Sequence, residues 1–202
     1  NLPGHEIFNR DFSPNGQYLA YTDKNNLFLF NIETKEETQI TSDGEWNKTI
    51  NGRADWVYEE EFSFTQAYEW SPSGGKIAFM RFDESEVKEY NMQVWGDQLY
   101  AQDYRFKYPK AGEQNARVNL VYYDLKTKIS KTIYEGKDDY IPRIYWMNDN
   151  TISYQWLNRQ QNDWKLIHYQ ISNSKETTVL EEKNKTYVEV SDIHYGKESL
   201  FY

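Results

Sequence analysis

The feature that most constrains the fold of this 202-residue chain is a pattern that returns along it. An aromatic residue, a cluster of turn residues and an alternating apolar run occur at residues 12–21 (FSPNGQYLAY) and again at residues 70–79 (WSPSGGKIAF). A weaker third copy lies at residues 146–154 (WMNDNTISY). Because Pro, Gly and Asn within a few residues favour tight turns, each copy predicts a β-hairpin. Repeats of one supersecondary unit indicate an array of similar units.

A second element follows each copy of this pattern. It consists of an apolar strand, a polar turn and a polar, Thr-rich strand, and it occurs at residues 26–40, 119–133 and 164–178. A polar outer strand protects the edge of a sheet from pairing with a stray chain. With the strand before each turn, the unit has four antiparallel strands, which is typical of a β-propeller blade. We therefore expect an all-β fold, a partial β-propeller; the alternative is a small twisted β-sandwich.

The repeats also predict how much of a propeller the chain contains. We expect units to begin at four places, near His5, Gln66, Asp139 and Tyr187. The fourth unit contributes only a first hairpin, at residues 193–202. Because the copies are farther apart than a plain blade of about 40–45 residues, the first two units carry insertions, at residues 43–65 and 84–118. A propeller closes with about four to eight blades, so three blades and a hairpin predict an open piece of a larger protein.

Composition excludes several classes of function. The chain has 23 Lys and Arg against 32 Asp and Glu, and its net charge of −9 argues against nucleic acid or an anionic membrane as a partner. Aromatic residues make up 17% of the chain, which suits the pleated faces of sheets. The absence of cysteine excludes disulfides, thiolate metal sites and a cysteine nucleophile. No apolar run approaches the roughly 18 residues of a membrane helix, and from the start at Asn1 we expect a processed protein or an excised piece.

Catalytic signatures are scarce in the sequence. The three histidines, His5, His168 and His194, do not have the spacing of metal ligands. Neither a Gly-x-Ser-x-Gly nucleophile elbow nor a Gly-rich phosphate loop is present, and no local signature supports a Ser-His-Asp triad. We therefore expect no catalytic residue, no metal site and no cofactor in this chain.

The most unusual segment is residues 55–62 (DWVYEEEF), where three successive glutamates lie between large aromatic residues. Asp55 can cap a short helical turn by accepting from backbone N–H groups, and carboxylates are tolerated near a helix start. Adjacent carboxylates repel each other and favour a bound cation. A protonated α-amine fits this requirement, since it carries three donors and has a pKa of roughly 7.7–8.0.

Two alternatives remain for this acidic segment. Composition alone favours an exposed acidic loop. The other alternative is a calcium site, although the oxygen-ligand spacing of an EF-hand loop is missing. Because successive residues of a helix do not share a face, two neighbouring glutamates converge on one ligand only at an irregular or very short turn.

The same segment resembles the dipeptidyl peptidase IV family. Residues 55–61 (DWVYEEE) carry the family's motif, and residues 108–112 (YPKAG) with Asn115 follow in the family's order. The resemblance extends over essentially the whole chain, more loosely at residues 1–40 and 165–202. Further matching stretches are Asn51-Gly52, Trp70-Ser71-Pro72, Phe82-Asp83, Glu86-Val87, Glu89-Tyr90 and residues 155–162 (QWLNRQQN).

The resemblance implies a fold and an activity. Members of this family of prolyl oligopeptidase-type serine peptidases have an N-terminal eight-bladed propeller and a C-terminal α/β-hydrolase domain. They remove dipeptides from peptide N-termini, preferably after Pro or Ala. Residues 1–202 then correspond to a segment of the propeller. The catalytic Ser, Asp and His and the oxyanion Tyr belong to the hydrolase domain, which this chain does not include. An Arg that holds the substrate carbonyl precedes the segment.

The resemblance also implies a site. By motif, the family's paired glutamates, which bind the free amine of the substrate, correspond to Glu60 and Glu61. We expect Asp55, Trp56 and Tyr58 to frame them. The implied role is selection of peptide substrates, with the hydrolase domain of the same protein as a partner. Two alternatives stay open: a non-catalytic propeller that binds proteins, and an inactive relative that has lost the catalytic serine.

Residues 84–118 resemble an arm that extends from the family's propeller and helps pair two subunits. Within it, residues 97–106 predict either a short helix or an aromatic-rich extended arm. We therefore expect a homodimer. The family works outside the cytoplasm, and the absence of cysteine favours a bacterial source, so we expect an exported protein, periplasmic or at the cell surface. Six residues of the arm supply an apolar surface that a lone arm cannot bury: Val94, Trp95, Leu99, Tyr100, Tyr104 and Phe106.

Overall fold

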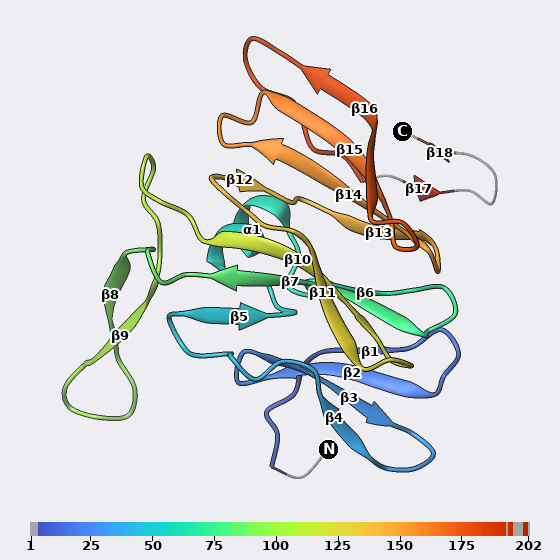
Figure 1. Ribbon diagram of the computed structural model, residues 1–202. Helices are drawn as coiled ribbons and strands as arrows, with labels where there is room; N and C mark the ends of the chain where they lie inside the picture. The colour runs from blue at the N-terminus through green and yellow to red at the C-terminus, as the bar shows by residue number, and fades with distance from the viewer. Residues whose placement is uncertain (1–3, 193, 196–199, 202) are drawn as a thin grey trace.

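The computed structural model describes residues 4–192, 194–195 and 200–201. In these ranges the chain forms β-strands and one short helix, α1 (Trp56–Phe62), and three antiparallel sheets follow one another from the N-terminal to the C-terminal part (Figure 1). The first sheet has the strand order β1-β2-β3-β4. Its strands are β1 (Phe8–Phe12), β2 (Tyr18–Asp23), β3 (Asn26–Asn31) and β4 (Glu37–Gln39).

The second and third sheets are built on the same plan. The second has the order β11-β10-β7-β5, and β6 also pairs with β7; the third has the order β12-β14-β15-β16, and β13 also pairs with β14. The second sheet contains β5 (Thr49–Asn51), β6 (Tyr68–Trp70), β7 (Lys76–Asp83), β10 (Arg117–Asp124) and β11 (Ile129–Tyr134). The third contains β12 (Asp139–Tyr140), β13 (Ile144–Asn148), β14 (Thr151–Asn158), β15 (Asp163–Gln170) and β16 (Lys175–Lys183).

Two segments share the position of the first strand in the second sheet. β5 pairs with residues 81–83 of β7, and β6 pairs with residues 77–79 of the same strand. Between them the chain leaves the sheet and forms α1. β12 and β13 divide the edge of β14 in the same way. Each sheet is therefore four strands wide, as a propeller blade requires.

The second unit begins earlier than the repeat pattern predicts. The pattern predicts its start near Gln66 and an insertion at residues 43–65, but β5 at Thr49–Asn51 already belongs to the sheet. Three residues are too short and too polar to be recognised as a strand. They pair because β7 extends beyond β6 and offers backbone donors and acceptors along its edge. The start of the third unit at Asp139 is confirmed.

The three predicted turns lie at the same end of neighbouring sheets. Gly16 and Gly74 close two of them with N–H groups that donate to Ser13 and Ser71, both at 2.8 Å, and both glycines have a positive φ that favours this residue. The Asn15 Nδ2 donates to the Ser73 carbonyl at 2.8 Å, and the Ser73 N–H donates to Asp149 Oδ1 at 3.0 Å. Equivalent turns thus contact each other from sheet to sheet, as in a radial array of blades.

Apolar side chains fill the spaces between successive sheets. Strands of the first and second sheets enclose one core cluster; its buried members are Ala20, Leu27, Leu29, Tyr68, Trp70, Ile77, Phe79, Val121 and Tyr123. A larger cluster joins the second sheet, α1 and the third sheet through residues such as Tyr58, Met80, Leu120, Tyr154 and Leu157. The outer strands β4 and β16 are exposed along their whole length, as predicted, whereas the outer strand β11 is exposed at residues 129–132 and partly buried at residues 133–134.

The arm is a two-stranded hairpin that projects from the second sheet (Figure 1). β8 (Glu89–Val94) pairs with β9 (Gln102–Lys107), so the extended alternative is correct and the short helix at residues 97–106 is wrong. In the predicted fourth unit, β17 (His194–Tyr195) pairs with β18 (Leu200–Phe201). Residues 193, 196–199 and 202 of that hairpin lie outside the described residues. Among the described helices, none is long and apolar enough to cross a membrane.

Candidate functional site

Helix α1 begins at the residue that the sequence predicts as its cap. Asp55 has an extended backbone, with φ −76° and ψ 179°, and its Oδ1 accepts from the Tyr58 N–H at 2.9 Å. The Asp55 side chain is buried, and this burial raises its pKa to about 6 against the opposing effect of the backbone hydrogen bonds from Tyr58 and Val57. The helix ends at Ser63, which adopts the left-handed conformation with φ 58° and ψ 40°.

The buried face of α1 is fixed to the third sheet. Val57, Tyr58 and Phe62 are its buried residues, and the Tyr58 ring contacts the rings of Phe82 and Tyr140. The Tyr58 Oη accepts from the Ile141 N–H at 2.9 Å. Burial raises the pKa of Tyr58 well above its usual value, so this hydroxyl stays neutral. The helix therefore has little freedom to turn or slide.

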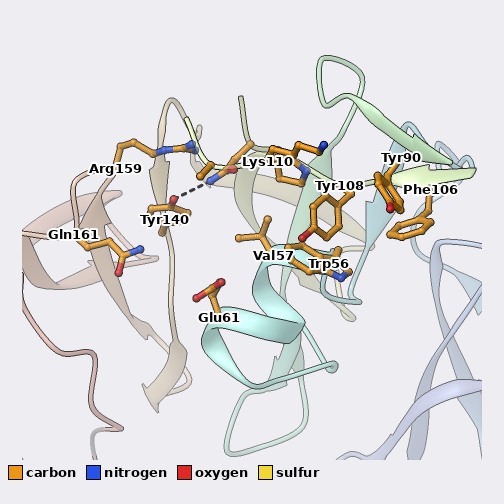
Figure 2. A pocket seen from close by; sticks show the side chains of 13 residues that line it. Trp56, Val57, Glu61, Tyr90, Phe106, Tyr108, Lys110, Tyr140, Arg159 and Gln161 are labelled. Atoms are coloured by element: carbon orange, nitrogen blue, oxygen red, sulfur yellow. Dashed lines mark hydrogen bonds between the residues drawn. The ribbon is translucent and has the colours of Figure 1, made fainter. Parts of the chain in front are cut away.

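The three glutamates of α1 are exposed but point in different directions. Glu61 lines a cavity of about 740 Å³ (Figure 2), whereas Glu59 lines a second cavity together with Asp55 and Glu84. Glu60 is exposed and does not line the cavity of Glu61. Divergence follows from helix geometry, because α1 is a regular helix of seven residues rather than an irregular turn.

The cavity beside Glu61 has an aromatic side and a polar side (Figure 2). On the aromatic side, the ring centroids of Trp56 and Tyr108 lie 4.1 Å apart. On the polar side, the Asn115 Nδ2 donates to the Tyr140 Oη at 2.8 Å, and the Arg159 guanidinium carbon lies 6.0 Å from the centre of the Tyr140 ring. The remaining lining residues are Val57, Tyr90, Phe106, Pro109, Lys110, Ala111 and Gln161.

Charges of both signs meet at this cavity. Arg159 is anchored by donation from its Nη2 to the Glu113 carbonyl at 2.6 Å, and Lys110 is exposed. Within the part of the chain that the structure describes, no ion pair or hydrogen bond engages the carboxylates of Glu60 or Glu61. An ionised carboxylate without partners has all its acceptor positions available to a ligand. The arrangement can therefore bind a group that donates several hydrogen bonds and carries positive charge.

Several lining residues lay within the matching stretches but were not identified as site residues. Lys110 belongs to the YPKAG segment, Asn115 follows that segment, and Arg159 and Gln161 belong to residues 155–162. These residues lie in stretches that match the family, so the sequence did point to them. That they line one cavity with Glu61 depends on how the base of the arm and the third sheet fold together. Tyr140 had no local signal.

The other predicted residues are placed as follows. Trp56 lines the cavity, Asp55 caps α1, and Tyr58 lies on the buried face of α1. Of the predicted arm surface, Phe106 is half-buried, and the exposed members are Val94, Trp95, Leu99, Tyr100 and Tyr104. Among the described residues, no group of three or more His, Cys, Asp or Glu side chains could hold a metal ion.

The chain is part of a β-propeller, because its successive sheets are each four strands wide and are joined through equivalent turns. The helix with the free carboxylates is inserted between two strands of the second sheet. Residues 2–198 match the family model described as the dipeptidyl peptidase IV (DPP IV) N-terminal region, and the chain belongs to this family. The predicted family and the partial propeller fold are both confirmed, and the β-sandwich alternative is wrong.

Known proteins similar to this chain are peptidases by name. Dipeptidyl peptidase 4 from Felis catus is 36% identical over 165 residues, which cover 75% of this chain and 22% of that protein. Prolyl endopeptidase FAP from Bos taurus is 34% identical over 160 residues, which cover 75% of this chain and 21% of that protein. The crystal structure of Porphyromonas gingivalis dipeptidyl peptidase 4 shares 39% identity and a TM-score of 0.85 over 90% of this chain and 26% of that one. The chain thus spans about a fifth to a quarter of these relatives.

Proposed function

We propose that this chain is the substrate-selecting propeller segment of a serine-type dipeptidyl peptidase that removes X-Pro or X-Ala dipeptides from peptide N-termini. In this proposal Glu60 and Glu61 bind the protonated α-amine of the peptide. The observation that carries the proposal is the Glu61 carboxylate, which lines a cavity without a protein partner in the described ranges and stands on a helix fixed to the neighbouring sheet.

The chemistry of the amine matches that carboxylate pair. An α-ammonium group has three donors, and unit charges 4 Å apart attract by about 4 kcal/mol at an effective dielectric constant of 20. Glu60 does not line the cavity of Glu61, so in this proposal its exposed side chain turns toward the bound amine and adds a second negative charge there. Asn115 and Arg159 on the polar side of the same cavity have N–H groups that can donate to carbonyl oxygens of the bound peptide.

Binding of the amine at a fixed place also fixes the position of the peptide bonds that follow it. Two extended residues span roughly 7 Å, at about 3.3–3.6 Å each. A peptide held by its amine therefore presents its second peptide bond at a constant distance from the glutamates. In the complete protein, a serine nucleophile of the hydrolase domain placed at that distance would cleave after the second residue, because positioning is a large part of catalysis.

The arm and the cellular location complete the proposal. The exposed aromatic and aliphatic side chains on the β8–β9 hairpin support pairing with a second subunit, since a projecting hairpin cannot cover them itself. The similarity to a bacterial dipeptidyl peptidase 4 supports an exported bacterial protein, periplasmic or at the cell surface.

The proposal predicts the activity of the complete protein and its dependence on the glutamates. We expect release of a chromophore from a Gly-Pro chromogenic substrate. Glu60→Gln and Glu61→Gln should each lower kcat/KM more than tenfold, because removing one partner of a charge pair that the bound peptide buries costs about 2–5 kcal/mol. Glu59→Gln is the matched control, since Glu59 faces the other cavity, and its kcat/KM should stay within about twofold.

Three outcomes of this experiment would contradict the proposal. Unchanged kinetics of both Glu60→Gln and Glu61→Gln would remove the amine-binding role. An equal loss in Glu59→Gln would show a general effect of charge. A folded but inactive parent protein would favour a non-catalytic binding propeller or an inactive relative.

A further inference from the structure

The C-terminal turn of α1 is held by a residue from another sheet. The last turn of this helix has no basic residue of its own, although the carbonyl groups at a helix C-terminus lack partners within the helix. The Arg143 Nη1 donates to the Phe62 carbonyl at 2.9 Å. The same nitrogen donates to the carbonyl of Pro142 at 2.8 Å. A guanidinium group at this end also complements the negative end of the helix dipole.

Arg143 is itself fixed from several sides. Its Nε donates to the Asp192 carboxylate, and its guanidinium carbon lies 5.6 Å from the centre of the Phe64 ring. The segment that carries Asp192 is tied to the third sheet, because the Gln155 Nε2 donates to the carbonyl of Ser191 at 2.7 Å. The Arg143 side chain is mostly buried, with 23% of its surface exposed. The guanidinium group therefore has a defined position relative to α1.

These contacts matter for the proposed site because of where the glutamates stand. Glu60 and Glu61 lie between Tyr58, which accepts from the third sheet, and Phe62, which accepts from Arg143. Asp55 holds only the opposite end of the helix. The turn that presents the two carboxylates is thus kept in place by Arg143.

We infer that Arg143, held by Asp192, is a positioning residue for the Glu60–Glu61 pair. This inference rests on the proposed function, because it concerns the same amine site. Arg143 does not line the cavity of Glu61, so it acts through the backbone of α1 and not by touching the ligand. Misplacement of a binding group by as little as 1 Å is enough to lower catalytic efficiency strongly.

The test uses the complete protein and a substrate with a free N-terminus. Arg143→Met should raise KM about tenfold and change kcat much less, because it removes a charge-assisted hydrogen bond that positions a binding group. Arg143→Lys should restore part of the affinity, and Asp192→Asn should cause a smaller loss. Arg81→Met is the matched control: Arg81 also pairs through its Nε with a carboxylate, Asp43, at 2.7 Å, and it alternates along β7 with Met80 and Phe82, which pack in the core cluster of α1. Its KM should stay within about twofold.

A double-mutant cycle separates positioning from a general loss of stability. If Arg143 acts through the glutamates, adding Arg143→Met to the variant that combines Glu60→Gln with Glu61→Gln should lower kcat/KM by less than about twofold, since coupled sites are not additive. Should Arg143→Met fail to fold in melting experiments, Asp192→Asn and Arg143→Lys replace it in the cycle.

The outcomes distinguish the inference from the function on which it rests. No effect of Glu60→Gln and Glu61→Gln would overturn the proposed amine site and this inference with it. A large effect of Glu61→Gln, combined with an unchanged KM in Arg143→Met or with fully additive losses, would leave the amine site standing and overturn the positioning role of Arg143.

Discussion

Asp55 and Glu84 place two buried carboxylates on the side of α1 that faces away from Glu61. Both line the second cavity, together with Glu59 and Lys107. The pKa of Glu84 is raised to about 7, mainly by burial and to a smaller extent by the charge of Asp55, while Lys107 acts in the opposite direction. The raised pKa values mean that the folded protein keeps protons on these groups at pH values where the unfolded chain releases them. Both groups therefore stabilise the fold most at low pH, below the pKa values of 3.8 for Asp55 and 4.5 for Glu84 in the unfolded chain.

This balance predicts a pH-dependent effect of one substitution. The stabilising contribution of protonated Glu84 is lost as the pH rises through about 7, where the buried carboxyl ionises. Gln at position 84 cannot ionise. The difference in unfolding free energy between Glu84→Gln and the parent should therefore shift in favour of the variant by about 1–3 kcal/mol between pH 4 and pH 8. Urea unfolding at the two pH values measures this gain. Glu86→Gln, at an exposed position, is the control; an equal gain there, or none in Glu84→Gln, would contradict the account.

At the scale of elements, the parts that local sequence determines were predictable. The turns at Gly16 and Gly74 and the cap at Asp55 each depend on residues within a few positions, and each was predicted. β5 was not, because Thr49–Asn51 pairs only where β7 offers a free edge. The contact of Arg143 with α1 was also not predictable, since it joins residues far apart in the chain. Local chemistry predicted the elements, and tertiary contacts decided how they share the site.

The β8–β9 arm supports a prediction at the same scale. The triple variant Trp95→Ser, Leu99→Ser and Tyr100→Ser removes the large exposed apolar side chains at the tip of the arm. If the arm pairs two subunits, the variant of the complete protein should sediment as a monomer at concentrations where the parent is a dimer. Ile129→Ser, an exposed apolar residue on the outer strand β11, should leave the dimer unchanged. A dimeric triple variant would remove the pairing role of the arm.

At the scale of the molecule, the candidate site lies where three parts of the chain meet. The second sheet supplies α1 with Glu61, the third sheet supplies Tyr140 and Arg159, and the base of the arm supplies Tyr108 and its neighbours (Figure 2). The chain spans only about a fifth to a quarter of its relatives, and the role that we propose for it is substrate selection within a larger protein. Amine recognition by the glutamates is the claim that links the propeller to that role.

The most direct test of this claim measures binding rather than cleavage. Calorimetric titration of the complete protein should show that the dipeptide Gly-Pro binds at least about tenfold more tightly than N-acetyl-Gly-Pro, which has no charged amine. In the variant that combines Glu60→Gln with Glu61→Gln, the two ligands should bind alike. Equal affinities in the parent protein, or an undiminished difference in the variant, would contradict amine recognition by these glutamates.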